Sequence, residues 1–346
     1  MTNLYDRHQN KKALAKKARA KTRSFGFSQK EFQDSTATWK DFKPKDVDIS
    51  SYTKGIVSKV IKDKIKVLLN NEMIDCRLFR EIPKTLRDNL IVGDKVYVNN
   101  ENKIVYREDR KNHLSRLRGD NTRYLSGSKH TVAVNIDFAI IVATISQPKF
   151  NLGLIDRYLI LCQYGNIKPI ICLNKIDLSN ERNPILSWYK EKLGIQVIEI
   201  SAKENIGLDK LKKIIQHKIV VLVGNSGVGK SSIINKLLKS DDIKTQFISE
   251  KGRQGKHTTT SSDMYILDEN TYIIDTPGIR ALNLIGIKKE NLQYYFREFY
   301  KFKPFCKYRD CLHISEPDCG IKEAVASGKI NKLRYESYLR IISQID

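Results

Sequence analysis

The chain has 346 residues, enough for two or three domains that each bury a core of their own. Its 62 Lys and Arg against 39 Asp and Glu give a formal charge of +23, which favours a polyanionic partner, nucleic acid before anionic lipid. No apolar run approaches the roughly 20 residues of a membrane-spanning helix, and the N-terminus lacks the apolar segment of a secretory signal. We therefore expect a cytoplasmic monomer without membrane contact.

Residues 1–50 are predicted to form a basic N-terminal arm. Its cations recur in a stretch without acids and with little apolar residue, at Arg7, Lys11, Lys12, Lys16, Lys17, Arg19, Lys21 and Arg23. Such a block is typical of tails that contact nucleic acid and become helical on binding, and a solvated tail without a role is the alternative.

Residues 51–110 carry short β-rich runs separated by turn residues, among them two Asn pairs at 70–71 and 99–100. Closely spaced strands of this kind predict a small barrel, either of the five-stranded oligonucleotide-binding (OB) type or of another small type. Tyr97 and Tyr106 alternate with Lys and Arg here, a pattern that suits RNA and equally an ordinary exposed sheet face. The basic segment 110–131 is poor in apolar residues, so we expect a linker there.

Residues 111–290 have a different pattern of apolar residues, because near-continuous apolar strands alternate with amphipathic helices. Strands are expected at 134–146, 168–178, 196–201, 218–224 and 271–278, and helices at 152–166, 183–194, 207–216 and 230–238. This alternation predicts a doubly wound α/β domain around a parallel sheet.

A phosphate-binding loop lies within this domain. The run GNSGVGKSS fills every fixed position of GxxxxGK[ST], after a strand and before a helix. Backbone N–H groups of such a loop surround the β-phosphate, Lys230 neutralises the β- and γ-oxygens, and the Ser231 hydroxyl ligates Mg²⁺. The predicted phosphate-binding residues are Gly224, Asn225, Ser226, Gly227, Val228, Gly229, Lys230, Ser231 and Ser232.

Guanine selectivity is predicted at the end of an apolar strand, by the NKID residues Asn174, Lys175, Ile176 and Asp177. The Asp177 carboxylate can accept hydrogen bonds from guanine N1–H and the exocyclic amine, Asn174 can meet the opposite edge, and the Lys175 stem can cover the ring. Adenine lacks that amine and would leave the carboxylate unpaired, so the nucleotide is GTP. The loop predicted to back the base consists of Ser201, Ala202 and Lys203.

The glycine-rich, polar run GRQGKHTTT at 252–260 is predicted to be a switch loop. Thr259, with Thr258 as second choice, could complete Mg²⁺ coordination, and His257 could polarise the attacking water or simply face solvent. The candidate catalytic residues are therefore His257, Thr259 and Lys230.

Asp275 and Gly278 belong to DTPG, where we expect Asp275 in the Mg²⁺ shell and the Gly278 N–H at the γ-phosphate. Ile279 follows, where Ras-like enzymes carry a water-orienting Gln, so unaided hydrolysis should be slow. NKID precedes the phosphate loop, whereas in ordinary small GTPases it follows. Only a circular permutation preserves the same spatial site.

Cys306, Cys311, His313 and Cys319 form a C-x₄-C-x-H-x₅-C cluster in residues 291–346. Three thiolates and one imidazole match a closed, tetrahedral structural Zn²⁺ site, with reduced cysteines or another soft metal as the alternatives. The aromatic run at 291–302 is expected to be a helix packed on the preceding domain, or else a base-stacking surface. The tail helix carries three cations and a tyrosine that could contact RNA or form a solvated face. They are Lys332, Arg334, Arg340 and Tyr338. The scattered thiols are expected to be buried and without a ligand, at Cys76, Cys162 and Cys172.

In their order, NKID, GNSGVGKSS, KHTTT, DTPGIR and the cysteine cluster resemble the RsgA family, the circularly permuted ribosome small-subunit-dependent GTPases. The resemblance extends from about Gly55 to the end. It implies an N-terminal OB-type barrel, a permuted P-loop GTPase and a mostly helical C-terminal zinc domain. The family's base-recognising, phosphate-loop and zinc positions fall on the motifs above, and its proposed catalytic histidine matches His257. One departure concerns the spacing of Arg253 from His257, because Gln254, Gly255 and Lys256 lie between them.

The resemblance further implies late maturation of the small (30S) ribosomal subunit, contact with its rRNA, and GTP hydrolysis stimulated by the subunit and coupled to release. Expected cofactors are one structural Zn²⁺ and Mg²⁺ with GTP. The alternative is an RNA-binding assembly scaffold that uses GTP as a slow structural ligand. A GTP-dependent small-molecule kinase is a remote third, because no acceptor pocket is visible in the sequence.

Overall fold

The computed structural model describes residues 51–61, 64–80, 82, 90–117, 129–179, 181, 183–239, 263–275, 284 and 287–345. These residues divide into two compact units near position 285 of the chain. Within the described residues, no helix combines the length and the apolar character needed to cross a membrane. The basic arm, the switch run with His257, Thr258 and Thr259, and the residues Gly278 and Ile279 all lie outside the described ranges.

The first strands close into a five-stranded barrel in the order β1-β2-β3-β5-β4. Their bounds are β1 Thr53–Ile61, β2 Lys64–Leu69, β3 Glu72–Leu78, β4 Lys95–Val98 and β5 Lys103–Arg107. All neighbours are antiparallel except β3 and β5, which are parallel, as in the OB fold. Asn70 and Asn71 adopt φ of 46° and 67° in the tight β2–β3 turn, a conformation that Asn tolerates better than most residues. The predicted OB-type barrel is confirmed.

A six-stranded sheet forms the centre of the second domain, in the order β10-β9-β8-β11-β13-β12. Its strands are β8 Phe138–Ala143, β9 Lys168–Leu173, β10 Gln196–Glu199, β11 Ile219–Gly224, β12 Asp263–Asp268 and β13 Thr271–Asp275. Only the edge strand β12 runs antiparallel to its neighbour. The apolar runs predicted these strands well, except β12, which the sequence did not reveal because it begins and ends with an aspartate.

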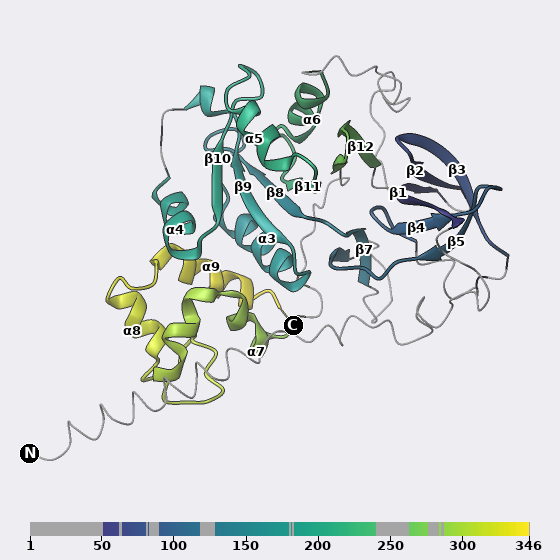
Figure 1. Cartoon of the computed structure of the whole chain (residues 1–346). Helices are drawn as coiled ribbons and strands as arrows, with labels where there is room; N and C mark the ends of the chain where they lie inside the picture. The colour runs from purple at the N-terminus through teal and green to yellow at the C-terminus, as the bar shows by residue number, and fades with distance from the viewer. Residues whose placement is uncertain are drawn as a thin grey trace, which may run out of the picture. The chain divides into compact units, whose positions relative to one another are not determined.

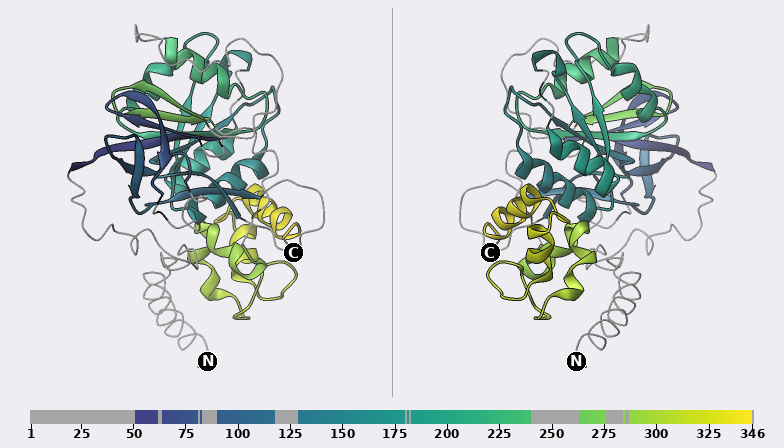
Figure 2. Two further views of the ribbon diagram at one scale, coloured as in Figure 1. Left: turned by 90° about the vertical axis from the view of Figure 1, so that its right-hand side faces the viewer. Right: turned by 90° about the vertical axis from the view of Figure 1, so that its left-hand side faces the viewer.

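Helices cover both faces of this sheet (Figures 1 and 2). They are α3 Leu152–Tyr164, α4 Pro184–Leu193, α5 Leu208–Ile215 and α6 Lys230–Lys239, with the 3₁₀ turn η3 Ile176–Leu178 after β9. Apolar residues of α5 and α6, such as Leu211 and Ile233, share one buried cluster with Ile140, Val220 and Ile273 of the strands. The helices α3 and α4 lie on the opposite face, so the predicted doubly wound architecture is confirmed (Figure 1).

The segment expected to be a linker is instead partly structured. Strands β6 His113–Leu117 and β7 Lys129–Val134 pair in an antiparallel two-stranded ribbon. Buried Asn112 fixes the ribbon to the sheet, because its Nδ2 donates to Ile136 O at 2.6 Å and its Oδ1 accepts from Ile136 N at 2.7 Å. The side chains of Leu114, Ala133 and Val134 are also buried in this ribbon.

Buried hydrogen bonds and an ion pair connect the barrel to the α/β domain. Asp94 is completely buried and accepts from Arg110 Nε at 2.7 Å and Nη2 at 2.8 Å. Asn135 Nδ2 donates to Gly93 O at 2.9 Å, and Val134 N donates to the carbonyl of Val92 at 3.0 Å. These bonds connect the barrel's β3–β4 connection to the residues that precede β8.

The C-terminal unit is mostly helical, as predicted. It contains α7 Lys289–Leu292, the 3₁₀ turns η5 Gln293–Tyr295, η6 Arg297–Lys301 and η7 Lys303–Phe305, then α8 Gly320–Ala326 and α9 Lys332–Ile342. The single helix expected for the aromatic run was wrong, since short turns replace it. Phe296 and Phe299 are buried against Tyr338 of α9, with ring centroids 5.1 and 4.9 Å away.

The structure corrects two further expectations for this unit, a base-stacking aromatic surface and an RNA-facing Arg334. Phe296, Phe299 and Tyr338 are at most 1% exposed, so they offer no base-stacking surface. Arg334 is not on an RNA-facing surface either, because it is 3% exposed and pairs with Glu298 at 2.7 Å. These aromatic and cationic side chains build the core of the unit.

Candidate nucleotide and metal sites

The phosphate-binding loop connects β11 to α6 at the carboxyl edge of the sheet, where the chain order reverses between β8 and β11. Ligands of doubly wound sheets bind at such a reversal. Gly224 and Gly229 adopt φ of 146° and 95°, which other residues rarely reach. A Cβ would lie 2.3 Å from Val142 O at Gly224, and 2.3 Å from Asn174 Nδ2 at Gly229. Both glycines are therefore required by the geometry of the loop.

Lys230, the first residue of α6, folds back over this loop. Its Nζ donates to the carbonyls of Gly224 and Asn225, each at 2.8 Å. Burial lowers the pKa of Lys230, and the negative charge of Asp275 opposes that shift. The ammonium thus lies among phosphate-loop carbonyls beside Asp275, in a position where a bound phosphate can replace the carbonyl acceptors.

Asn174 differs from its predicted role. The side chain is 2% exposed, Nδ2 donates to Val228 O at 2.8 Å, and Oδ1 accepts from Ala202 N at 3.0 Å. The amide therefore braces the phosphate loop against the loop after β10, in addition to any contact with a base. The sequence alone could not show that the polar atoms of Asn174 are used within the protein.

The structure brings Asp177 and Ser201 into direct side-chain contact. Ser201 Oγ donates to Asp177 Oδ1 at 2.5 Å and accepts from Glu204 N at 3.1 Å. The Ser201 hydroxyl is the main cause that lowers the pKa of the exposed Asp177 carboxyl. An ionised carboxylate at this position can accept the two N–H groups on one edge of guanine.

Lys175, the second NKID residue, is fixed by its backbone conformation and by a contact of its side chain. Its backbone is left-handed, with φ of 62°, and its Nζ donates to Gln147 O at 3.0 Å. Gln147 belongs to the β8–α3 loop, and no motif in the sequence pointed to it. Ile176 starts η3, while Lys203 is exposed beside Glu204.

Asp275 ends β13, next to β11 in the sheet, which places it at the same edge as the phosphate loop. Ser231 and Ser232 follow Lys230 in the first turn of α6. A lysine and a serine hydroxyl at the N-terminus of α6, with a carboxylate at the same sheet edge, suit a Mg²⁺–nucleotide complex, in which magnesium neutralises phosphate charge. The roles assigned to His257, Thr259 and Gly278 concern residues outside the described ranges.

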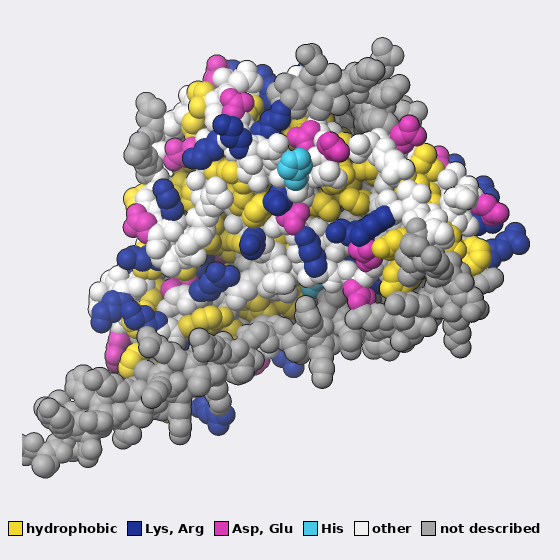
Figure 3. All heavy atoms as spheres, in the orientation of Figure 1, with side chains coloured by type: hydrophobic (Ala, Val, Ile, Leu, Met, Phe, Trp, Pro, Cys, Tyr) yellow, Lys and Arg dark blue, Asp and Glu magenta, His cyan; other side chains and the backbone are white. Residues whose placement is uncertain are grey.

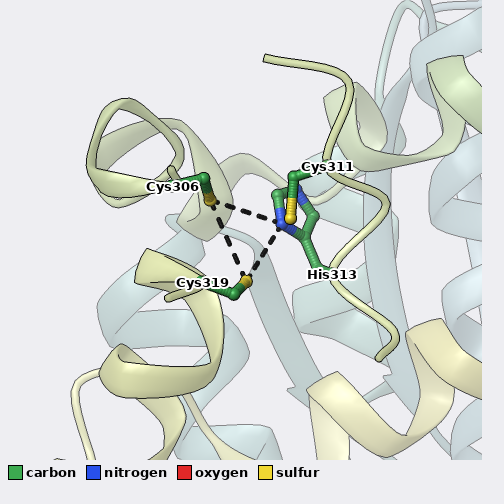
Figure 4. A group of neighbouring side chains, drawn as sticks. All are labelled: Cys306, Cys311, His313 and Cys319. Carbon is green, nitrogen blue, oxygen red and sulfur yellow. Dashed lines mark hydrogen bonds between the residues drawn. The ribbon is translucent and has the colours of Figure 1, made fainter. Parts of the chain in front are cut away.

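The C-terminal unit brings its four predicted ligands together. One ligand atom from each of Cys306, Cys311, His313 and Cys319 lies within 4.8 Å of the others, and Figure 4 shows these side chains pointing toward one another. His313 Nδ1 is 3.3 Å from Cys319 Sγ and 3.5 Å from Cys306 Sγ. This is a closed donor set of the kind that holds a structural ion.

The surroundings of this cluster fit a cation. Burial raises the pKa of Cys311 to about 12 and also raises that of Cys306, while burial lowers the pKa of His313 to about 4. Without a cation the thiols would stay protonated, so a metal ion is the natural replacement for their protons. Cys76, Cys162 and Cys172 are buried in apolar surroundings away from this cluster, as expected.

A second residue orients the imidazole. His313 Nε2 lies 2.9 Å from Gln293 Oε1, and Gln293 Nε2 donates to Glu290 O at 2.7 Å. The Gln293 oxygen can only accept, so Nε2 carries the proton and Nδ1 is the metal-facing nitrogen. No sequence pattern pointed to Gln293, which lies 20 residues before His313.

Comparisons with known proteins agree with this geometry. A family model described as RsgA GTPase matches residues 107–285. "Small ribosomal subunit biogenesis GTPase RsgA" of Flavobacterium psychrophilum is 36% identical over 292 residues, covering 80% of this chain and 88% of the relative. The protein of the same name from Clostridium botulinum is 39% identical over 298 residues, covering 84% and 97%.

Two solved structures are similar as well. A crystal structure of YjeQ from Thermotoga maritima has a TM-score of 0.67 and 29% identity, covering 85% of this chain and 98% of that chain. The structure of YloQ, a circularly permuted GTPase, has a TM-score of 0.62 and 27% identity, covering 85% and 95%. The permuted order of the motifs is thus shared with a known fold.

Proposed function

Because the chain belongs to the RsgA GTPase family and is a GTPase, we propose that it binds the small ribosomal subunit and assists its late maturation. In this proposal the subunit stimulates GTP hydrolysis, and hydrolysis releases the protein. The observation that carries it is the meeting of phosphate loop, base-recognising residues and Asp275 at one sheet edge, in a permuted order shared with relatives named for small-subunit biogenesis.

Charge supports an rRNA partner. The chain carries a formal charge of +23, and Lys and Arg side chains recur across the described surface in Figure 3. A surface of this sign gains affinity from phosphate contacts and loses it with rising salt. Binding to the subunit should therefore weaken steeply as the salt concentration rises.

The proposed site assignments follow the motifs. GTP is held by the phosphate loop, by the NKID residues and by Ser201, Ala202 and Lys203. Mg²⁺ is held through Ser231 and Thr259, and water is activated by His257. One Zn²⁺ is held by the cysteine–histidine cluster, which stabilises the C-terminal unit. We further propose a four-part division into arm 1–50, barrel 51–110, GTPase 111–290 and zinc unit 291–346, in a monomer that works in the cytoplasm.

The test measures GTP turnover with and without purified small subunits, and co-sedimentation with GDP or a non-hydrolysable GTP analogue. We expect subunits to raise turnover by at least tenfold, and the analogue to retain more protein on the subunit than GDP does. His257→Ala should abolish stimulation without loss of binding. Unstimulated turnover with nucleotide-independent binding would instead favour an RNA-binding scaffold that holds GTP as a structural ligand.

A further inference from the structure

A lysine of the barrel reaches the nucleotide-binding edge of the sheet. Lys59 of β1 forms an ion pair with Asp263, the first residue of β12, with Nζ and Oδ1 2.7 Å apart. The two side chains are 21% and 12% exposed, so water screens this pair less than a surface pair. Strands β1 and β12 contact each other within one compact unit, as Figure 1 indicates. A positively charged side chain of the barrel therefore forms an ion pair with a residue of the GTPase domain.

The partner of this lysine lies next to the residue expected at the magnesium ion. Asp263 is directly opposite Asp275 in the antiparallel β12–β13 pair. Side chains of directly opposite residues project from the same face with Cβ atoms about 5 Å apart, and like charges in such a pair repel. Two carboxylates thus stand side by side at the edge that holds the phosphate loop.

Each of the two carboxylates has its own nearby cation. Lys230 begins α6, directly after the phosphate loop, at the same sheet edge at which Asp275 ends the neighbouring strand β13. Lys59 neutralises Asp263 from the barrel. If Lys59 were absent, the negative charge of Asp263 would act on Asp275 and on any phosphate bound beside it.

We propose that Lys59 is a positioning residue for the nucleotide site: by neutralising Asp263 it sets the potential at Asp275 and so the preference for GTP over GDP. The inference rests on the GTPase assignment and deepens it. GTP carries about one more negative charge than GDP, so additional negative potential penalises GTP more. The barrel then contributes to nucleotide discrimination, and a partner that pulls the barrel from β12 shifts the preference toward GDP.

The test measures dissociation constants for GDP and a non-hydrolysable GTP analogue at fixed magnesium and low salt. In Lys59→Met the ratio of the analogue constant to the GDP constant should rise about fivefold or more, at the low end of coupling between sites. Asp263→Asn leaves Lys59 unneutralised, so the ratio should fall. The double variant should return to within about twofold of wild type, as should Lys59→Arg, and high salt should reduce every shift.

Lys54→Met is the matched control. Lys54 lies on the same strand and pairs with Glu108 at the barrel surface at 2.5 Å, so this variant removes an equal charge away from β12. Its nucleotide ratio should match wild type.

A purely structural ion pair would lower the melting temperature of both single variants without changing the ratio, and that result would overturn the proposal. Shifts of the same sign in both single variants would overturn it too. If Lys59→Met does not fold, the fall expected in Asp263→Asn still decides the matter. A wild-type protein that binds neither nucleotide would refute the GTPase assignment rather than this inference.

Discussion

Asn174 can be tested as a structural brace of the nucleotide site by replacing it with alanine. The change removes the donor to Val228 O at 2.8 Å and the acceptor of Ala202 N at 3.0 Å, at a position that is 2% exposed. A buried group left without its partner costs about 1–3 kcal/mol, so two such groups cost about 2–6 kcal/mol. For a unit of this size each kcal/mol lowers the melting temperature by about 2–4 °C, which predicts a fall of roughly 4–24 °C.

The assay is thermal unfolding of the nucleotide-free protein, combined with GDP and GTP-analogue affinities. Both affinities should fall together, by roughly 10- to 100-fold, because the brace supports the loop that holds the β-phosphate common to both nucleotides. Asn174→Asp keeps the acceptor for Ala202 but turns an oxygen toward Val228 O, so it should destabilise at least as much. The isosteric change thereby separates hydrogen bonding from side-chain volume.

Asn183→Ala is the matched control. Asn183 caps α4 by accepting from Ile185 N at 3.2 Å, away from the nucleotide site. Loss of this cap should cost about 1 kcal/mol and leave both affinities unchanged. An Asn174→Ala protein with weakened affinity but an unchanged melting temperature without nucleotide would refute the brace and leave Asn174 as a base-contacting residue only.

Three further predictions concern the same sites. Elemental analysis should find one zinc per chain, lost together with C-terminal stability in Cys311→Ser but retained in Cys76→Ser; zinc retained in both variants would contradict the cluster. The Ser201 hydroxyl lowers the pKa of Asp177, so the carboxylate stays ionised below the pH at which a free aspartate protonates. Guanine affinity depends on this ionised carboxylate. The affinity should therefore be lost as the pH falls through the lowered pKa of Asp177. Ser201→Ala should move that loss to higher pH in a binding titration, and identical profiles would argue against the pair. Gly229→Ala, with φ of 95° and a Cβ 2.3 Å from Asn174 Nδ2, should abolish nucleotide binding, whereas Gly194→Ala, with φ of 65° and open space, should cost only about 1 kcal/mol of stability.

The sequence predicted those parts of the protein in which local pattern and function coincide. The GNSGVGKSS run requires a strand, a left-handed glycine turn and a helix, and the structure has all three at Gly224 and Lys230. The cysteine cluster was equally clear, because four soft ligands in so short a segment have few other uses. In both cases the chemistry depends on residues that are close together in the chain.

The remainder depends on contacts between distant residues, which no local pattern records. Gln293 orients His313 across 20 positions, and Asp94 pairs with Arg110 across 16. The aromatic residues at 295–299 have the composition of a helix face or of a stacking surface, and packing against Tyr338 decides that they are core. Strand β12 was missed for the same reason, since its pairing with β13 rather than its own composition makes it a strand.

The permutation explains how a barrel comes to be attached beside the phosphate site. In an unpermuted GTPase the strand equivalent to β8 is preceded by the segment that follows the DTPG strand, so nothing can be fused ahead of it without interrupting a switch. Here the chain enters β8 from the barrel, through Val134 and Asn135, and the barrel also contacts Asp263 of β12. In the sheet order, β8 and β12 flank the β11–β13 pair that carries the phosphate loop and Asp275. A rotation of the barrel against the sheet would therefore act on both neighbours of the strands that carry the phosphate loop and Asp275, which in the proposed function is a route from the barrel to the nucleotide site.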